Sequence, residues 1–301
     1  MFLAKIRDFR MDTVTFFDLL SKGDIRCLRR SRVFFNRYYT DAHNERQSYD
    51  LVIPRSASGS TGLILCIHGG GWFEGSKSAY TDALIQVSEE KGFAAASVNY
   101  RYVSESVGFA DILDDVTSAL AAIKAKGSEY GVRFDKALLT GISAGGHISL
   151  MYAYTRRNEA PVRPVCVVEL CGPTDLEHPF YYSEENSISK AVGVDYFRGV
   201  ISRGVGYTID PEDFDAARPA LRAYSPIRFV GRNTVPTVFG HGEQDEIVPY
   251  QNALDLDAKL TQCGVEHAFI SFPNSGHGCE DPTAMSKIMS LFFAYADKYL
   301  K

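Results

Sequence analysis

The sequence lacks the features of a membrane-spanning protein, a nucleic-acid-binding protein or a protein built on disulfides. No uninterrupted apolar run is long enough to cross a bilayer. The formal net charge is −5 at pH 7, whereas a surface that binds nucleic acid needs an excess of positive charge. The six cysteines show no C-x-x-C spacing. Cys66 and Cys166 lie within strand-like runs, which indicates buried thiols in a reducing compartment.

The N-terminus also lacks the central apolar segment of a signal peptide, because Lys5, Arg7, Asp8 and Arg10 interrupt its apolar residues. We therefore expect a cytoplasmic protein with no membrane partner and no nucleic-acid partner. Residues 1–46 carry ten Lys and Arg against six Asp and Glu, with aromatic residues interleaved. We predict that they form an N-terminal extension of short helices that packs on the main domain, residues 47–301.

Strand-like runs alternate with helical segments from Tyr49 onward. Continuous apolar runs are typical of strands that are covered on both faces, and apolar residues at steps of three and four indicate helices. This alternation predicts an α/β fold with a mostly parallel central sheet and helices on both faces. The predicted strands are residues 49–53, 63–67, 93–99, 137–141, 165–170, 237–241 and 267–272, and the clearest predicted helices are residues 111–126, 251–263 and 282–300.

One long stretch interrupts the alternation. Between residues 170 and 237 the sequence is polar and rich in aromatic residues, with no clear strand pattern. We predict a small cap insertion here, at about residues 177–225. It would lie over the carboxyl edge of the sheet, where open α/β folds bind ligands.

The segment Gly141-Ile142-Ser143-Ala144-Gly145 has the pattern G-x-S-x-G between a predicted strand and a helix. A serine on so sharp a turn has a strained backbone, and the positions two before and two after it need residues without side chains. The turn exposes the hydroxyl above the N-terminus of the following helix. The pattern by itself also fits a glycine-rich turn with an incidental serine, so the assignment needs a second motif.

The second motif is His68-Gly69-Gly70-Gly71-Trp72, directly after a predicted strand. Three glycines allow the backbone to approach a substrate and to aim N–H groups at a developing oxyanion. We predict that the amides of Gly70, Gly71 and Ala144 form this oxyanion hole. We also predict that Trp72 forms one wall of a substrate pocket. A phosphate-binding loop fits less well, because no G-K-[ST] follows.

A serine hydroxyl needs a base to become a nucleophile, and the sequence has seven histidines. His68 and His147 lie inside the glycine motifs, where we expect them to brace the loops. His241 ends a predicted strand ahead of the expected acid, and His267 opens the last predicted strand. His277 lies in a glycine-containing loop after that strand, so we predict that it is the base.

The base in turn needs a carboxylate that orients it. Asp245 follows the predicted strand 237–241, one strand before the histidine, and Asp175 is the alternative one strand earlier. We favour Asp245, because Val248-Pro249 closes its loop back onto the core and would hold the carboxylate still.

The order Ser143, Asp245, His277 is that of the α/β-hydrolase catalytic triad. Together, the segments HGGGW, VNYRYVSE, GISAGGH, GPTDL, HGEQDEIVP and SGHG resemble serine carboxylesterases of the HGGG type. These are related to hormone-sensitive lipases and to the feruloyl and acetyl-xylan esterase-like group. The resemblance covers about residues 49–300 and implies the α/β-hydrolase fold. The family usually has YRL followed by a proline-containing turn, whereas this chain has YRY followed by VSE at residues 100–105. A substrate preference is therefore not carried over.

These residues predict a serine ester hydrolase that acts through an acyl-enzyme. Its partner would be a small-molecule ester, and we expect no metal or organic cofactor, because protein groups supply the nucleophile, the base and the oxyanion donors. Charged residues interrupt the cap insertion, which favours short acyl groups over the long chains that a lipase binds. Two alternatives remain: an amidase, such as an aryl formamidase, or a peptidase on the same triad, and a non-catalytic small-molecule receptor on this fold.

Overall fold

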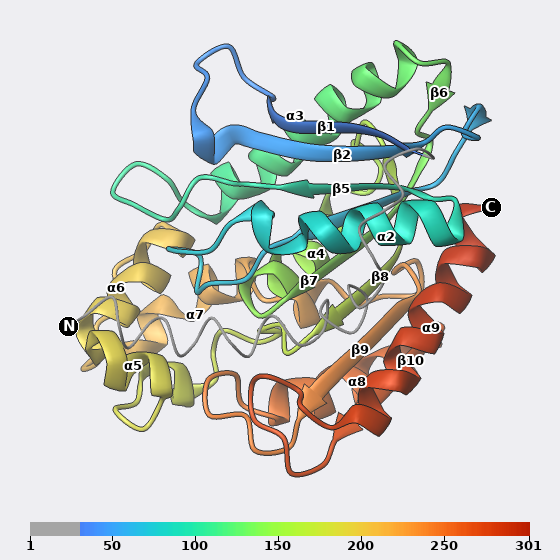
Figure 1. Ribbon diagram of the computed structural model, residues 1–301. Helices are drawn as coiled ribbons and strands as arrows, with labels where there is room; N and C mark the ends of the chain where they lie inside the picture. The colour runs from blue at the N-terminus through green and yellow to red at the C-terminus, as the bar shows by residue number, and fades with distance from the viewer. Residues whose placement is uncertain (1–30) are drawn as a thin grey trace.

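The computed structural model describes residues 31–301, and an eight-stranded sheet forms its centre (Figure 1). Across the sheet the strand order is β1-β2-β5-β4-β7-β8-β9-β10. The pairs β1–β2 and β2–β5 are antiparallel, and all other neighbours are parallel. The strands are β1 (Ser31–Tyr38), β2 (Ser48–Pro54), β4 (Leu63–Ile67), β5 (Ala94–Val98), β7 (Lys136–Ile142), β8 (Arg163–Leu170), β9 (Thr237–Gly242) and β10 (His267–Phe272). A separate pair, β3 (Gly59–Ser60) and β6 (Val132–Arg133), is also parallel.

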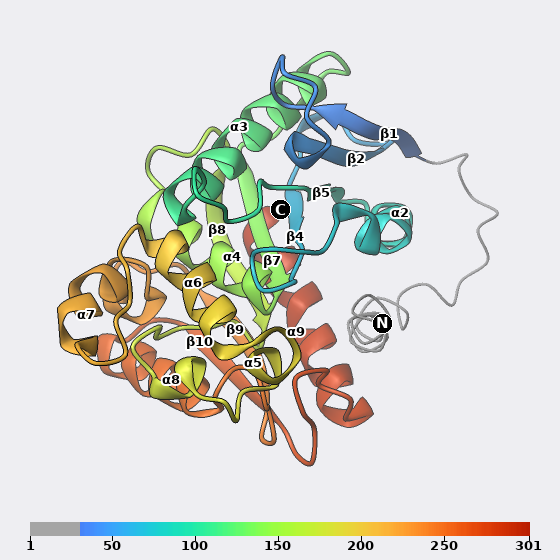
Figure 2. The same cartoon turned by 90° about the vertical axis from the view of Figure 1, so that its left-hand side faces the viewer.

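Helices cover both faces of the sheet (Figure 2). Residues of α3 (Phe109–Ser128), α4 (Ala144–Thr155) and α8 (Gln251–Cys263) share one apolar cluster, and residues of α2 (Thr81–Lys91) and α9 (Pro282–Leu300) share the other. The predicted fold class is thereby confirmed. No helix within residues 31–301 combines the length and the apolar character that crossing a membrane requires.

Strand β4 explains why the strands read as continuous apolar runs. Leu63, Leu65 and Ile67 belong to the first cluster, while Ile64 and Cys66 belong to the second. Because successive side chains of a strand point to opposite faces, a strand between two helical layers needs apolar residues at every position.

The segment between β8 and β9 contains no strand, as expected from its sequence. It forms α5 (Ser187–Val192), α6 (Val194–Val205) and α7 (Phe214–Ala223), with the 3₁₀ turns η3 (Pro179–Tyr182) and η4 (Pro226–Phe229) on either side. Figure 1 shows the three helices together at one end of the sheet.

Within residues 31–46 the structure contradicts the predicted helices, except for the one 3₁₀ turn η1 (Glu45–Gln47). Residues 31–38 form strand β1, which pairs antiparallel with β2 at the edge of the sheet. Val33 and Phe34 pack against opposite clusters, as alternate strand residues do. The open edge of β2 provides backbone partners that the local sequence does not reveal. Residues 1–30 lie outside the described residues, and their predicted helices stay a prediction.

Candidate active site

Ser143 lies on a strained turn between β7 and α4. Its backbone has φ 56° and ψ −124°, in a region that non-glycine residues rarely adopt. Its amide donates to the carbonyl oxygen of Leu170 at 2.8 Å, which fixes the turn against β8. The flanking glycines are required by space: a Cβ at Gly145 would lie 2.0 Å from the oxygen of Ile67, and one at Gly141 would lie 2.4 Å from the carbonyl carbon of Gly145.

The glycine loop after β4 lies directly beside this turn. A Cβ added at Gly69 would be 3.4 Å from the Cβ of Ser143. Gly70, Gly71 and Trp72 all have positive φ (111°, 55° and 66°), so the chain bends sharply in a conformation that favours glycine. No backbone carbonyl within residues 31–301 accepts the amide hydrogens of Gly70 or Gly71. The amide of Ala144 opens α4, where the first N–H groups of a helix have no partner within the helix.

A buried histidine and an arginine hold this glycine loop from outside. His68 donates from Nδ1 to the oxygen of Gly69 at 2.7 Å, accepts at Nε2 from Arg46 at 2.9 Å, and stacks on the ring of Tyr100 at 4.2 Å. Burial lowers the pKa of His68 to about 3; the Gly69 hydrogen bond opposes this shift, and the charge of Arg46 adds a smaller lowering effect. His68 is thus neutral and braces the loop, as expected.

The structure contradicts the predicted pocket-wall role of Trp72. Solvent reaches 1 % of this residue, and its ring packs beside Phe109 and Phe197 of α6. The Trp72 Nε1 donates to Nδ1 of His147 at 3.2 Å, and His147 Nε2 donates to the oxygen of Tyr224 at 2.8 Å. Trp72 and His147 therefore link the glycine loop to α4 and to the segment after α7. Trp72 does not line a pocket, because the cap insertion covers its indole.

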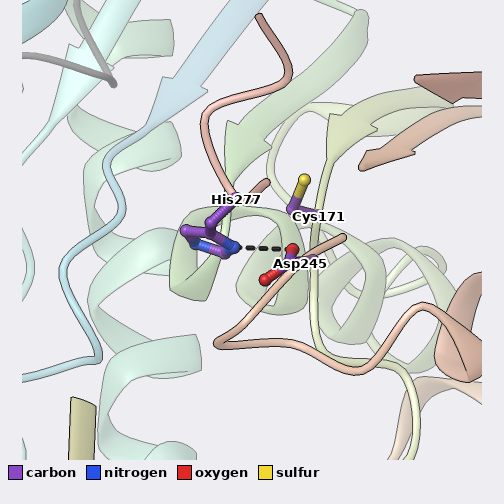
Figure 3. A group of neighbouring side chains, drawn as sticks. All are labelled: Cys171, Asp245 and His277. Atoms are coloured by element: carbon purple, nitrogen blue, oxygen red, sulfur yellow. Dashed lines mark hydrogen bonds and ion pairs between the residues drawn. The ribbon is translucent and has the colours of Figure 1, made fainter. Parts of the chain in front are cut away.

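Asp245 and His277 meet at the carboxyl ends of β9 and β10 (Figure 3). His277 Nδ1 donates to Asp245 Oδ2 at 2.8 Å. The other oxygen, Oδ1, accepts the amides of Ile247 and Val248, each at 2.9 Å. The Asp245 side chain is 0 % exposed and that of His277 is 9 % exposed. The turn that contains Val248 thus holds the carboxylate, as predicted from the sequence.

A second histidine, His241, also faces this carboxylate. Its Nε2 lies 3.1 Å from Asp245 Oδ2 and 2.9 Å from the oxygen of Val248. Burial acts to raise the pKa of Asp245, but the charges and hydrogen bonds of His277 and His241 outweigh it and hold that pKa below its usual range. Burial likewise acts to lower the pKa of His277, and the Asp245 carboxylate outweighs it, so the pKa of His277 is raised.

The other candidate residues have partners elsewhere. The carboxylate of Asp175 accepts from Arg228 at 2.8 Å. His267 pairs with Asp257 at 3.1 Å on the surface of α8. Neither contact involves Ser143, Asp245 or His277. Sequence reasoning missed His241 as a partner of Asp245; its position four residues before the acid was the available signal.

The mostly parallel sheet, the two helical layers and the strained serine turn define an α/β-hydrolase. A family model described as BD-FAE matches residues 49–260, and the chain belongs to this family. The predicted family is thereby confirmed.

Among curated proteins, the chain is similar to the esterase LipC of Mycobacterium tuberculosis, at 25 % identity over 222 residues, covering 72 % of this chain and 52 % of LipC. It is 30 % identical over 240 residues to a probable isoprenylcysteine alpha-carbonyl methylesterase, ICMEL1, of Arabidopsis thaliana, covering 77 % of this chain and 48 % of that protein. The chain thus spans about half the length of these relatives. It covers 11 % of the non-reducing polyketide synthase atr1 of Stereocaulon alpinum, at 27 % identity and over 72 % of this chain.

Solved structures share the fold at low identity. A truncated carbohydrate esterase from gut microbiota aligns with a TM-score of 0.68 at 22 % identity, covering 89 % of this chain and 97 % of that chain. A bacterial heroin esterase aligns with a TM-score of 0.66 at 20 % identity, covering 95 % and 89 % of the two chains. At these identities the likeness supports the fold.

Proposed function

We propose that this protein is a carboxylesterase in which Ser143, His277 and Asp245 form the catalytic triad. The observation that carries the proposal is that all three residues lie at the same edge of the sheet, where its parallel strands end. Ser143 follows β7, Asp245 follows β9 and His277 follows β10, and these strands run parallel in one sheet. The carboxyl ends of parallel strands are the usual ligand-binding edge of such folds.

In the proposed reaction, the Ser143 Oγ attacks the acyl carbonyl carbon while His277 Nε2 accepts its proton. The amides of Gly70, Gly71 and Ala144 donate to the oxyanion that develops. The imidazolium then protonates the leaving alcohol. Water, deprotonated by His277, then attacks the acyl carbonyl carbon; the carboxylic acid leaves and the imidazolium returns its proton to the Ser143 Oγ.

The names of the relatives support ester hydrolysis without agreeing on a substrate. They include an esterase, a probable methylesterase, a carbohydrate esterase and a heroin esterase. Because one fold and one triad serve many esters, the substrate depends on the residues around the site.

We further propose that the substrates have short acyl groups. A lipase exposes a large aliphatic surface on its lid to bind a long chain, since each buried methylene contributes about 0.8 kcal/mol. The large hydrophobic side chains exposed on the cap insertion, residues 177–225, are Tyr196 and Tyr207, and both end in a hydroxyl. This surface is better suited to polar surroundings than to an oil phase.

The test of this function is covalent labelling of Ser143. A fluorophosphonate should modify the wild-type chain at Ser143, and Ser143→Ala should take up no label. We expect Ser143→Ala to lower kcat by several orders of magnitude with little change in Tm, because triad members act as a unit. An unlabelled wild-type chain that still binds small molecules would favour the receptor alternative. Faster turnover of formamides than of esters would favour the amidase.

A further inference from the structure

Two cysteines meet beside the candidate base. Cys171 directly follows β8, and Cys279 lies two residues after His277. Their Sγ atoms are 3.0 Å apart, although the residues are 108 positions apart in the chain. Both residues are buried, at 0 % and 1 % exposed. No other two cysteines within residues 31–301 are in hydrogen-bonding contact.

One member of this pair, Cys171, lies close to the acid and the base. The Cys171 Sγ, a carboxylate oxygen of Asp245 and a ring nitrogen of His277 all lie within 4.8 Å of one another (Figure 3). Cys279 belongs to the loop that carries His277. A bond between the two sulfurs would therefore join the end of β8 to the loop of the base.

We propose that Cys171 and Cys279 are a redox-sensitive modification site: a peroxide oxidises them to a disulfide, and this bond lowers the esterase activity. The effect on activity rests on the function proposed above, while formation of the bond does not. Two sulfurs in a disulfide are 2.03–2.05 Å apart. The thiols therefore need to approach by only about 1 Å.

The chemistry balances with hydrogen peroxide as the oxidant. One cysteine thiolate attacks a peroxide oxygen, the O–O bond breaks, and a sulfenic acid and hydroxide form. The second thiolate then attacks the sulfenic sulfur and displaces hydroxide, which leaves as water after protonation. In sum, two thiols and one hydrogen peroxide give one disulfide and two waters. A dithiol reverses the step by exchange and is itself oxidised to a cyclic disulfide.

Formation of the disulfide would displace His277 more than Asp245. Cys171 is anchored to the sheet, because its amide donates to the oxygen of Gly240 at 2.9 Å. Cys279 is held by one longer backbone bond, from its amide to the oxygen of Gly276 at 3.3 Å, within its own loop. The movement thus falls mainly on the loop of His277, and a displacement of about 1 Å in a catalytic group can cost roughly 100-fold in rate.

Burial controls how fast the pair reacts. It raises the pKa of the Cys171 thiol, so the reactive thiolate is scarce at neutral pH. Small oxidants such as hydrogen peroxide have better access to buried thiols than bulky disulfides do. We therefore expect slow oxidation that accelerates as the pH rises.

The experiment treats the full chain with hydrogen peroxide in the presence of EDTA, which removes metal ions that could bind the same donors or drive oxidation. Peptide mapping without reductant should reveal a link between Cys171 and Cys279. The kcat on a p-nitrophenyl ester should fall by roughly 10- to 100-fold and recover with dithiothreitol. The Tm should rise by about 5 °C, because the bond closes a long loop.

Cys279→Ser and Cys279→Ala are the test variants. Cys263→Ser is the matched control, because Cys263 Sγ donates to the oxygen of Val230 at 3.7 Å and forms no contact with another cysteine within residues 31–301. For each variant, the kcat after peroxide treatment is compared with the kcat of the same variant before treatment. The Cys279 variants should show no dithiothreitol-reversible loss, and Cys263→Ser should respond like the wild type.

Either of two results overturns the proposal: no link between Cys171 and Cys279 in the treated wild type, or a reversible loss of activity that persists in both Cys279 variants. A link that leaves kcat unchanged overturns its catalytic part. A chain with no esterase activity before treatment would instead contradict the proposed function, and peptide mapping would still report on the bond.

Discussion

The Nδ1 atom of His277 donates to Oδ2 of Asp245 at 2.8 Å, and the turn around the carboxylate holds its other oxygen through two backbone amides. The aspartate thus has one face fixed by its own loop and one face directed at the imidazole. This arrangement sets the tautomer of His277, leaving Nε2 as the nitrogen that can accept a proton.

Asp245→Asn should lower kcat by about 10,000-fold, because the amide neither fixes this tautomer as a carboxylate does nor stabilises the imidazolium. The measurement is kcat on p-nitrophenyl acetate, with Tm as a check of folding. Asp175→Asn is the control: its carboxylate binds Arg228, so we expect activity within tenfold of wild type. Loss of activity in the control with retention in Asp245→Asn would reassign the acid.

The pH profile should report the raised pKa of His277. The base works only when neutral, so kcat/KM should be low in acid and should rise with pH to a plateau. Because the Asp245 carboxylate outweighs the effect of burial on His277, the midpoint should lie above the ordinary value of about 6.5. In Asp245→Asn the midpoint should move to lower pH. A wild-type midpoint below the ordinary value would contradict this electrostatic account.

Arg46→Met should displace the glycine loop after β4 without changing the proposed triad. The guanidinium donates to His68 Nε2 and to the oxygens of Tyr100 and Gly75. Its loss leaves buried acceptors unsatisfied, which costs about 2 kcal/mol of stability.

With the glycine loop less well positioned, we expect kcat of Arg46→Met to fall by about tenfold with a smaller change in KM. Steady-state kinetics and thermal unfolding measure the two effects. Arg133→Met is the control, since the exposed Arg133 side chain pairs with the surface carboxylate of Asp135, at 3.7 Å. Equal effects in both variants would remove Arg46 from the support of the loop.

A series of p-nitrophenyl esters tests the acyl preference. We expect higher kcat/KM for the acetate and butyrate than for the decanoate, because the cap presents tyrosines and charged residues in place of an aliphatic surface. A steady rise in kcat/KM toward long chains, with activation at an oil–water interface, would contradict the short-acyl proposal.

The sequence alone determined most of the sheet and the turns that carry the candidate site residues. The strand-like runs from residue 49 onward correspond to β2, β4, β5 and β7–β10, and the predicted helices 251–263 and 282–300 match α8 and α9. The glycines around Ser143 and the loop of Asp245 were also predicted correctly. These features depend on the spacing of apolar residues and on the residue types at turns. Both are set by residues that are close in the sequence.

Only the tertiary structure decided the remaining features. Residues 31–38 became a strand because the open edge of β2 pairs with them, and Trp72 became buried because Phe197 of the cap packs over it. The Cys171–Cys279 contact joins positions 108 residues apart. Each of these features depends on a contact with residues that are distant in the sequence. The local pattern and spacing of residues do not predict such a contact.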